Sequence, residues 1–141
     1  MEILGKISLE DREEIKELMA RYSFAVGSGD PDGVAACFTE DGIFEGRERY
    51  LVGRQNIRQV GMDAKPDHIP RYIVTNVIIK GRANEPDVAD VKCLLLSYAY
   101  RPDGPKFLTS GGYEDVVVKV NGEWLFRHRA VRPDKPVADE A

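Results

Sequence analysis

Apolar residues recur at helical spacing near the start of the chain. Beyond Ser8 they fall three or four residues apart, and charged side chains fill the positions between them. The Ser8 hydroxyl can cap a helix, and Asp11 adds negative charge at the positive helix end. Gly27-Ser28-Gly29 ends the pattern, so we expect a first helix between Ser8 and Gly27. Its apolar positions are Ile15, Leu18, Met19, Tyr22, Ala25 and Val26.

Shorter elements follow this helix. Asp30 and Pro31 are typical of a helix cap and a first helical residue, so they predict a short second helix. Residues 43–45 and 50–52 are expected to be extended, and a third helix is expected over 53–62.

The chain after Pro70 is dominated by β-rich runs separated by turn-forming residues. Asn121-Gly122 favours a tight hairpin, because both residues of a type I′ turn need positive φ angles. Helices followed by long strands predict an α+β fold. The long strands can curl around the helices and leave an apolar pocket at one end. The β-rich runs are 72–80, 88–100, 107–120 and 123–131.

The composition is that of an ordinary globular domain. The chain has 141 residues and a net charge of −4, so we expect one domain over 1–141, with its core at about 8–132 and a loosely ordered tail at 133–141. The mild acidity argues against a nucleic-acid partner. No apolar run approaches the ~20 residues that cross a bilayer, and the N-terminus has no signal-peptide pattern. We therefore expect a cytoplasmic protein without a membrane partner.

Cysteine and histidine are scarce. The two cysteines, Cys37 and Cys93, stand among apolar residues, which favours buried reduced thiols over the alternative of one disulfide. The two histidines, His68 and His128, lie far apart in the sequence. No CxxC, HxH or HExxH spacing occurs, so we expect no metal site.

Short motifs in a characteristic order connect the chain to a known family. They are Arg21-Tyr22, Gly29-Asp30 and the segments 36–42, 52–57, 71–76, 112–115 and 121–126. Over about residues 8–132 this ordered set resembles the SnoaL-like branch of the nuclear-transport-factor-two-like fold. Scytalone dehydratase, ketosteroid isomerase and polyketide cyclases share that fold. The resemblance implies a cone-shaped barrel-like sheet, antiparallel or mixed, wrapped around about three N-terminal helices, with many functions possible.

The residues that the family uses for catalysis are only partly present. Gly27 occupies the position where dehydratase-like members carry an aspartate, and Tyr72 occupies that of a histidine. A second family histidine has no counterpart in the run 88–100. The resemblance therefore does not carry the dehydratase mechanism over intact.

Three residues remain as candidate catalytic groups. Strand alternation places His128 on one face with Trp124 and Phe126, where an imidazole would suit proton transfer; the alternative is a hydrogen-bonded histidine at the sheet end. Tyr72 could donate a hydrogen bond to a carbonyl or enolate oxygen. Glu45 could shuttle a proton if apolar neighbours raise its pKa, or strand alternation could turn it to solvent.

Further residues are candidates for binding a substrate. Each also has a structural alternative, as a core aromatic residue or as a solvated loop histidine. These candidates are Tyr22, Tyr113, Phe44, Trp124, Phe126 and His68. The resemblance also implies a homodimer through the outer sheet face, on which we expect Leu125 and Val131.

Together these patterns predict an enzyme without metal or organic cofactor that acts on a small hydrophobic cyclic molecule. The expected step is proton transfer next to a carbonyl, as in a dehydratase, isomerase or cyclase. The alternative is a non-catalytic module of the same fold, such as a dioxygenase small-subunit-like protein or a carrier of apolar ligands. The absence of the family's acid/base pair at Gly27 and Tyr72 favours this alternative.

Overall fold

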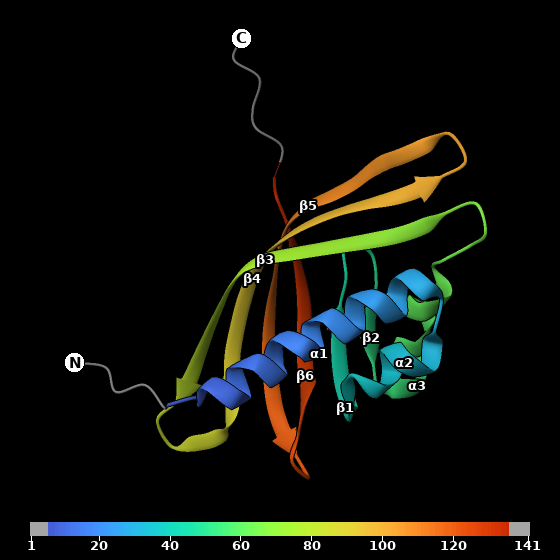
Figure 1. The fold of residues 1–141 in the computed structure, drawn as a ribbon. Helices are drawn as coiled ribbons and strands as arrows, with labels where there is room; N and C mark the ends of the chain where they lie inside the picture. Colours follow the sequence, from blue (N-terminus) through green and yellow to red (C-terminus); the bar gives the residue numbers. More distant parts are fainter. Residues whose placement is uncertain (1–5, 136–141) are drawn as a thin grey trace.

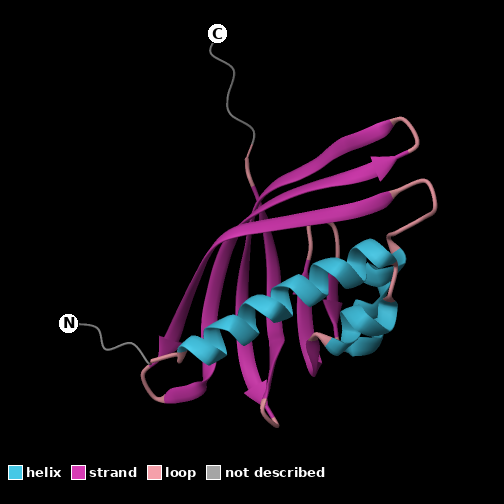
Figure 2. Cartoon of the chain, viewed as in Figure 1, coloured by secondary structure: helices cyan, strands magenta, loops and turns pink. Residues whose placement is uncertain are grey.

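The computed structural model describes residues 6–135. Its helices lie together on one side of a curved six-stranded sheet (Figures 1 and 2). This arrangement confirms the predicted α+β class. The elements are α1 (Leu9–Ser28), α2 (Pro31–Ala36), β1 (Phe38–Glu45), β2 (Tyr50–Val52), α3 (Arg54–Ile57), the 3-10 helix η1 (Arg58–Met62), β3 (Ile69–Arg82), β4 (Glu85–Arg101), β5 (Gly104–Val120) and β6 (Glu123–Pro133).

The sheet is mixed and open. Its strand order is β2-β1-β6-β5-β4-β3, and neighbouring strands are antiparallel except for the parallel pair β1 and β6. The family resemblance implied a barrel-like sheet. The sheet is instead open, because β2 and β3 are its two edges and do not pair with each other. It curls around α1, which lies across its concave face in Figure 1.

Both ends of α1 are fixed as the sequence predicts. The Asp11 amide donates to the Ser8 hydroxyl at 3.0 Å, and Gly29 ends the helix at a φ of 67°. The Asp11 side chain also accepts a hydrogen bond from the Trp124 indole at 2.9 Å, which ties the start of α1 to β6. The apolar positions of α1 are buried against the sheet.

Two elements differ from the sequence prediction. The expected third helix is short, and its second half is the 3-10 helix η1, in which Gly61 packs directly on Pro31. The first strand begins at Phe38 rather than at residue 43, because Cys37 accepts a hydrogen bond from the Phe126 amide of β6. A long-range strand partner of this kind leaves no local signal in the sequence.

A β-bulge at Arg127 changes which residues of β6 face the core. Val117 pairs with Phe126 but Val116 pairs with His128, so Arg127 is an extra residue in the strand. Beyond it the alternation is inverted, and Arg129 points inward instead of His128. The prediction that His128 shares a face with Trp124 and Phe126 is therefore wrong.

The predicted turn at Asn121-Gly122 is confirmed. Asn121 and Gly122 both have positive φ angles, 51° and 81°, as a type I′ turn requires. Cys37 and Cys93 are buried free thiols. Within residues 6–135, no helix is long and apolar enough to span a membrane. Of the tail predicted to be loose, residues 136–141 lie outside the described part, whereas Asp134 donates its amide to Ser110.

Candidate functional site

A cavity of about 540 Å³ lies between α1, η1 and the concave face of the sheet. Its walls come from every layer of the fold, so the curl of the sheet around the helices creates it. The lining residues are Tyr22, Phe44, Gly46, Arg47, Glu48, Arg49, Val60, Tyr72, Leu95, Ser97, Leu108, Thr109, Tyr113 and Val131.

Aromatic rings form the deep wall of the cavity. Tyr22 projects from α1 and is 1% exposed. Its ring meets Tyr113 edge-on at 6.2 Å and stacks on Phe44 at 6.5 Å between centroids. These rings offer an apolar surface suited to a flat or cyclic ligand.

The loop between β1 and β2 covers part of the cavity. Arg47 donates a hydrogen bond to the Thr109 hydroxyl at 3.0 Å, and Arg49 makes a two-pronged ion pair with Asp63 at the end of η1. These contacts tie the loop to β5 on one side and to the helical layer on the other. Glu48, between the two arginines, is the one carboxylate among the described residues that line the cavity.

Hydroxyl groups supply most of the remaining polarity of the lining. Burial holds the pKa of Tyr72 above its ordinary value, and burial does the same for Tyr22 and Tyr113. All three phenols therefore stay protonated near neutral pH and can donate hydrogen bonds. Ser97, on β4, is 1% exposed, and its hydroxyl donates to the Thr109 carbonyl at 3.4 Å. The phenol donors suit a ligand that carries a carbonyl or hydroxyl oxygen.

A buried ion pair lies directly behind the aromatic wall. Arg129 and Asp115 are neighbours on β6 and β5, with 3.5 Å between Nε and Oδ1 and no exposed side-chain surface. The guanidinium carbon lies 3.5 Å from the Tyr113 ring centroid, 4.4 Å from that of Phe126 and 4.5 Å from that of Tyr22. No described residue hydrogen-bonds to the charged atoms of either side chain. Neither residue lines the cavity itself.

The structure brings four of the predicted site residues together around one cavity. These are Tyr22, Phe44, Tyr72 and Tyr113. Two further aromatic candidates pack in the core instead. Phe126 lies against Phe38 with 5.3 Å between ring centroids, and Trp124 is hydrogen-bonded to Asp11. The prediction that these two line the pocket is therefore wrong.

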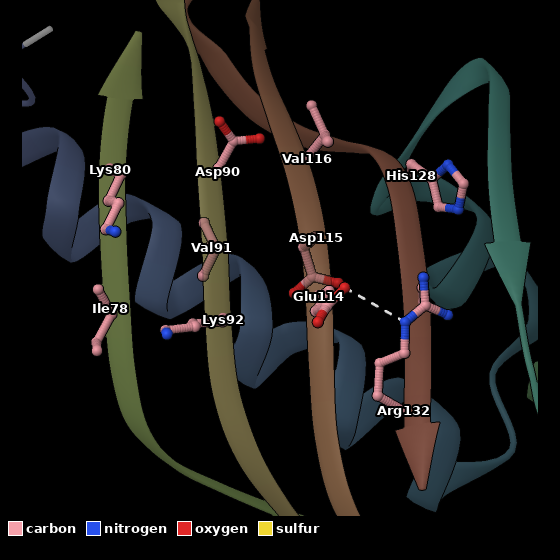
Figure 3. Close-up of a pocket in the computed structure, with 11 residues that line it drawn as sticks. Ile78, Lys80, Asp90, Val91, Lys92, Glu114, Asp115, Val116, His128 and Arg132 are labelled. Atoms are coloured by element: carbon pink, nitrogen blue, oxygen red, sulfur yellow. Dashed lines mark hydrogen bonds and ion pairs between the residues drawn. The ribbon is translucent and has the colours of Figure 1, made fainter. Parts of the chain in front are cut away.

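His128 and Glu45 lie on the opposite, outer face of the sheet. His128 lines a hollow of about 360 Å³ there, together with Glu114 and Arg132 (Figure 3). Glu45 accepts a hydrogen bond from Arg132, which lowers the pKa of the carboxyl, and lies 3.7 Å from His128 Nε2. Glu45 is thus an ion-paired surface residue, and the environment proposed to raise its pKa is absent. The same inversion of β6 places Val131 in the inner cavity rather than on the outer sheet face, where it was expected. Leu125, the other residue expected on that face, is buried.

His68 also lies outside the cavity lining. It stands in the loop before β3, where its backbone pairs with Lys65 and its Nδ1 lies 3.1 Å from Arg101 Nη1. The predicted role at the cavity rim therefore has no support in the geometry.

Arg129, Asp115, Arg49 and Glu48 were missed by sequence reasoning. Arg129 stands two residues before Val131, which simple alternation places on the outer face, so only recognition of the bulge at Arg127 could have placed Arg129 inside. The segment Gly112-Tyr113-Glu114-Asp115 offered one signal, because an aspartate two residues from an inward tyrosine shares its face. Arg49 and Glu48 stand in a loop without a periodic pattern.

Arg71 occupies the space beside Gly27. A β-carbon at position 27 would lie 2.6 Å from Arg71 Nη1, and that nitrogen donates a hydrogen bond to the Gly27 carbonyl. A cationic side chain thus stands where an acidic residue would be expected from the resemblance.

Comparisons with known proteins agree with this architecture. A sequence profile described as a SnoaL-like domain matches residues 8–130. Among solved structures, the chain is similar to Rv3472 from Mycobacterium tuberculosis, a protein of unknown function, at 30% identity and a TM-score of 0.84, with 94% of this chain and 81% of that chain covered.

Two further solved structures show the same fold at lower identity. ActVI-ORFA from Streptomyces coelicolor is 24% identical with a TM-score of 0.77, covering 87% of this chain and 96% of that one. A protein from Catenulispora acidiphila, solved in complex with S-DNPA, is 24% identical with a TM-score of 0.77, covering 89% of this chain and 95% of that one. None of the curated proteins matches the chain.

Proposed function

We propose, from the membership of this chain in the SnoaL-like domain family, a function as an enzyme. The proposed enzyme needs no cofactor and transfers a proton on a small hydrophobic cyclic substrate. The observation that carries the proposal is the inner cavity, which is lined by Tyr72 as well as by the aromatic residues Tyr22, Phe44 and Tyr113. Such a lining fits an apolar ring that bears one reactive oxygen.

The chemistry would begin at the substrate oxygen. A hydrogen bond from Tyr72 to a carbonyl stabilises the negative charge that develops when a proton leaves the neighbouring carbon. Glu48 is the candidate acceptor for that proton, because it supplies the carboxylate of the lining while His128 and Glu45 are on the other side of the sheet. Dehydration, isomerisation and aldol-type cyclisation all pass through such a step.

Proton exchange on a simple ketone tests this proposal without knowledge of the natural substrate. In deuterated buffer, the protein should accelerate exchange of the protons next to the carbonyl of 2-tetralone, followed by nuclear magnetic resonance. Tyr72→Phe should slow this exchange by about 10²-fold, the loss typical of an oxyanion-stabilising donor. Glu48→Gln should slow it as well. Tyr50→Phe is the matched control, because Tyr50 is exposed and outside the cavity lining.

A non-catalytic carrier of apolar ligands is the second candidate. The observation in its favour is that both histidines lie outside the inner cavity and that Arg71 borders Gly27. The same experiment separates the two functions. Binding of 2-tetralone without accelerated exchange would support the carrier, whereas exchange that depends on Tyr72 would support the enzyme.

For the assembly we propose a homodimer formed through the outer sheet face. Leu94, Leu96, Ile73 and Ile78 are about half exposed there and form an apolar strip across β3 and β4. Burial of such a strip against a second copy would remove apolar surface from water.

A further inference from the structure

The most unusual feature of the molecule outside the cavity lining is the unpartnered charge behind it. Buried polar groups in folded proteins nearly always find hydrogen-bond partners. Arg129 and Asp115 face each other at 3.5 Å, and none of their charged atoms has a hydrogen-bond partner among residues 6–135. Such a pair costs free energy to bury, which calls for an explanation in terms of function.

The pair is arranged asymmetrically with respect to the cavity. The Arg129 guanidinium carbon lies 3.5 Å from the Tyr113 ring centroid and 4.5 Å from that of Tyr22, and both rings line the cavity. Arg129 lowers the pKa of both phenols against the larger effect of burial. Asp115 raises the pKa of Tyr113, but less strongly than Arg129 lowers it. The guanidinium is therefore the charge of the pair that packs against both rings of the cavity wall.

We propose that Arg129 is a positioning residue that polarises the Tyr113 and Tyr22 rings from behind, so that the cavity prefers a ligand whose oxygen carries negative charge. A cation over a ring face draws electron density from the ring, which makes the attached hydroxyl a better hydrogen-bond donor. Asp115 holds the guanidinium in place. This inference rests on the proposed function and deepens it, since it names ligands with an enolate or phenolate oxygen as the preferred class.

A pair of matched ligands isolates this preference. The first is 2,4-dinitro-1-naphthol, which is ionised at neutral pH because of its nitro groups. The second is its methyl ether, which has nearly the same size and no charge. Their dissociation constants, measured by calorimetry at pH 7.5, give a ratio that reports charge preference independently of ring binding.

The decisive variant is Arg129→Met combined with Asp115→Leu. Replacing both partners of a buried ion pair by apolar residues usually preserves folding, and here it leaves the net charge unchanged. We expect the wild-type protein to bind the naphtholate more tightly than the ether. In the double variant the ratio of the two dissociation constants should fall by about tenfold. Arg129→Lys, which keeps the charge but loses the planar group, should retain part of it. Arg127→Met, on the exposed bulge of the same strand, should leave it unchanged.

The outcomes distinguish this inference from the proposed function. A preference that falls in the double variant and persists in Arg127→Met supports the role of Arg129. If both ligands bind and their ratio is the same in wild type and double variant, the role of Arg129 is overturned while the cavity remains a ligand site. If neither ligand binds the wild-type protein, the proposed ligand class fails and this inference fails with it.

Discussion

Asp115 and Arg129 form an ion pair between adjacent strands in which neither side chain is exposed to solvent. Loss of one partner leaves the other charge buried and uncompensated, whereas loss of both leaves an apolar contact. We predict that Arg129→Met lowers the free energy of unfolding by about 3–5 kcal/mol, and that adding Asp115→Leu recovers most of that loss. Urea denaturation followed by circular dichroism measures both values. Equal destabilisation by the single and double variants would contradict this account.

The same pair predicts a dependence of stability on pH. Burial raises the pKa of Asp115 above its ordinary value of 3.8, and Arg129 offsets only part of that effect. The folded state therefore binds the proton more tightly than the unfolded state. The contribution of Asp115 to stability is present at low pH and is lost as the pH rises through its folded pKa.

Burial raises the pKa of Asp115 to about 7, so Asp115→Asn should flatten this decline in stability between about pH 4 and pH 7. Asp90→Asn is the matched control, because hydrogen bonds from Arg82 lower the pKa of Asp90. The stability that Asp90 contributes is present above its ordinary pKa and is lost as the pH falls. Urea denaturation across this pH range should thus show a changed slope for Asp115→Asn alone. A slope that matches the wild type in both variants would argue against the raised pKa.

The fold could be predicted from the sequence to a large extent because its signals are local. Ser8, Gly29 and Asn121-Gly122 determine helix ends and a turn through contacts within a few residues. The curl of the sheet and the parallel pairing of β1 with β6 depend on contacts between distant segments. The curl was expected from the length of the strands and from the family resemblance, whereas the parallel pairing of β1 with β6 was not predicted.

The site was harder to predict, because one residue decides which side chains face it. Alternation from Trp124 correctly places Phe126 inside, but the bulge at Arg127 inverts every residue after it. His128 was therefore assigned to the cavity and Arg129 to the outer face. A single inserted residue leaves no compositional trace, so sequence periodicity alone could not reveal the exchange. Tyr22, Tyr72 and Tyr113 escaped this error because they lie on other elements.

Two glycines at which an added β-carbon would lie less than 3 Å from another residue should respond differently to substitution. At Gly27 the closest atom is Arg71 Nη1 at 2.6 Å, the mobile end of a long side chain, and the closest backbone atom is the Pro70 carbonyl oxygen at 3.0 Å. At Gly61 it is the Pro31 Cα at 2.5 Å, which is backbone. Gly27→Ala should change the free energy of unfolding by less than about 1 kcal/mol, since alanine also favours the helix. Gly61→Ala should cost about 1–3 kcal/mol by overpacking. Thermal and urea denaturation measure both, and similar losses at the two sites would contradict this contrast.

The proposed homodimer predicts a specific response to charge on the outer sheet face. Leu94 is 55% exposed at the centre of the apolar strip, and it stands opposite Thr75 on β3. Leu94→Glu would place a carboxylate in the proposed interface, where desolvation without a partner is unfavourable. Light scattering after size exclusion should give twice the chain mass of 15.8 kDa for the wild type and the single mass for Leu94→Glu. Leu9→Glu, at an 83% exposed position of α1, should remain dimeric. A monomeric wild-type protein would contradict the proposed dimer. A Leu94→Glu variant that stays dimeric would show that the interface lies on another surface.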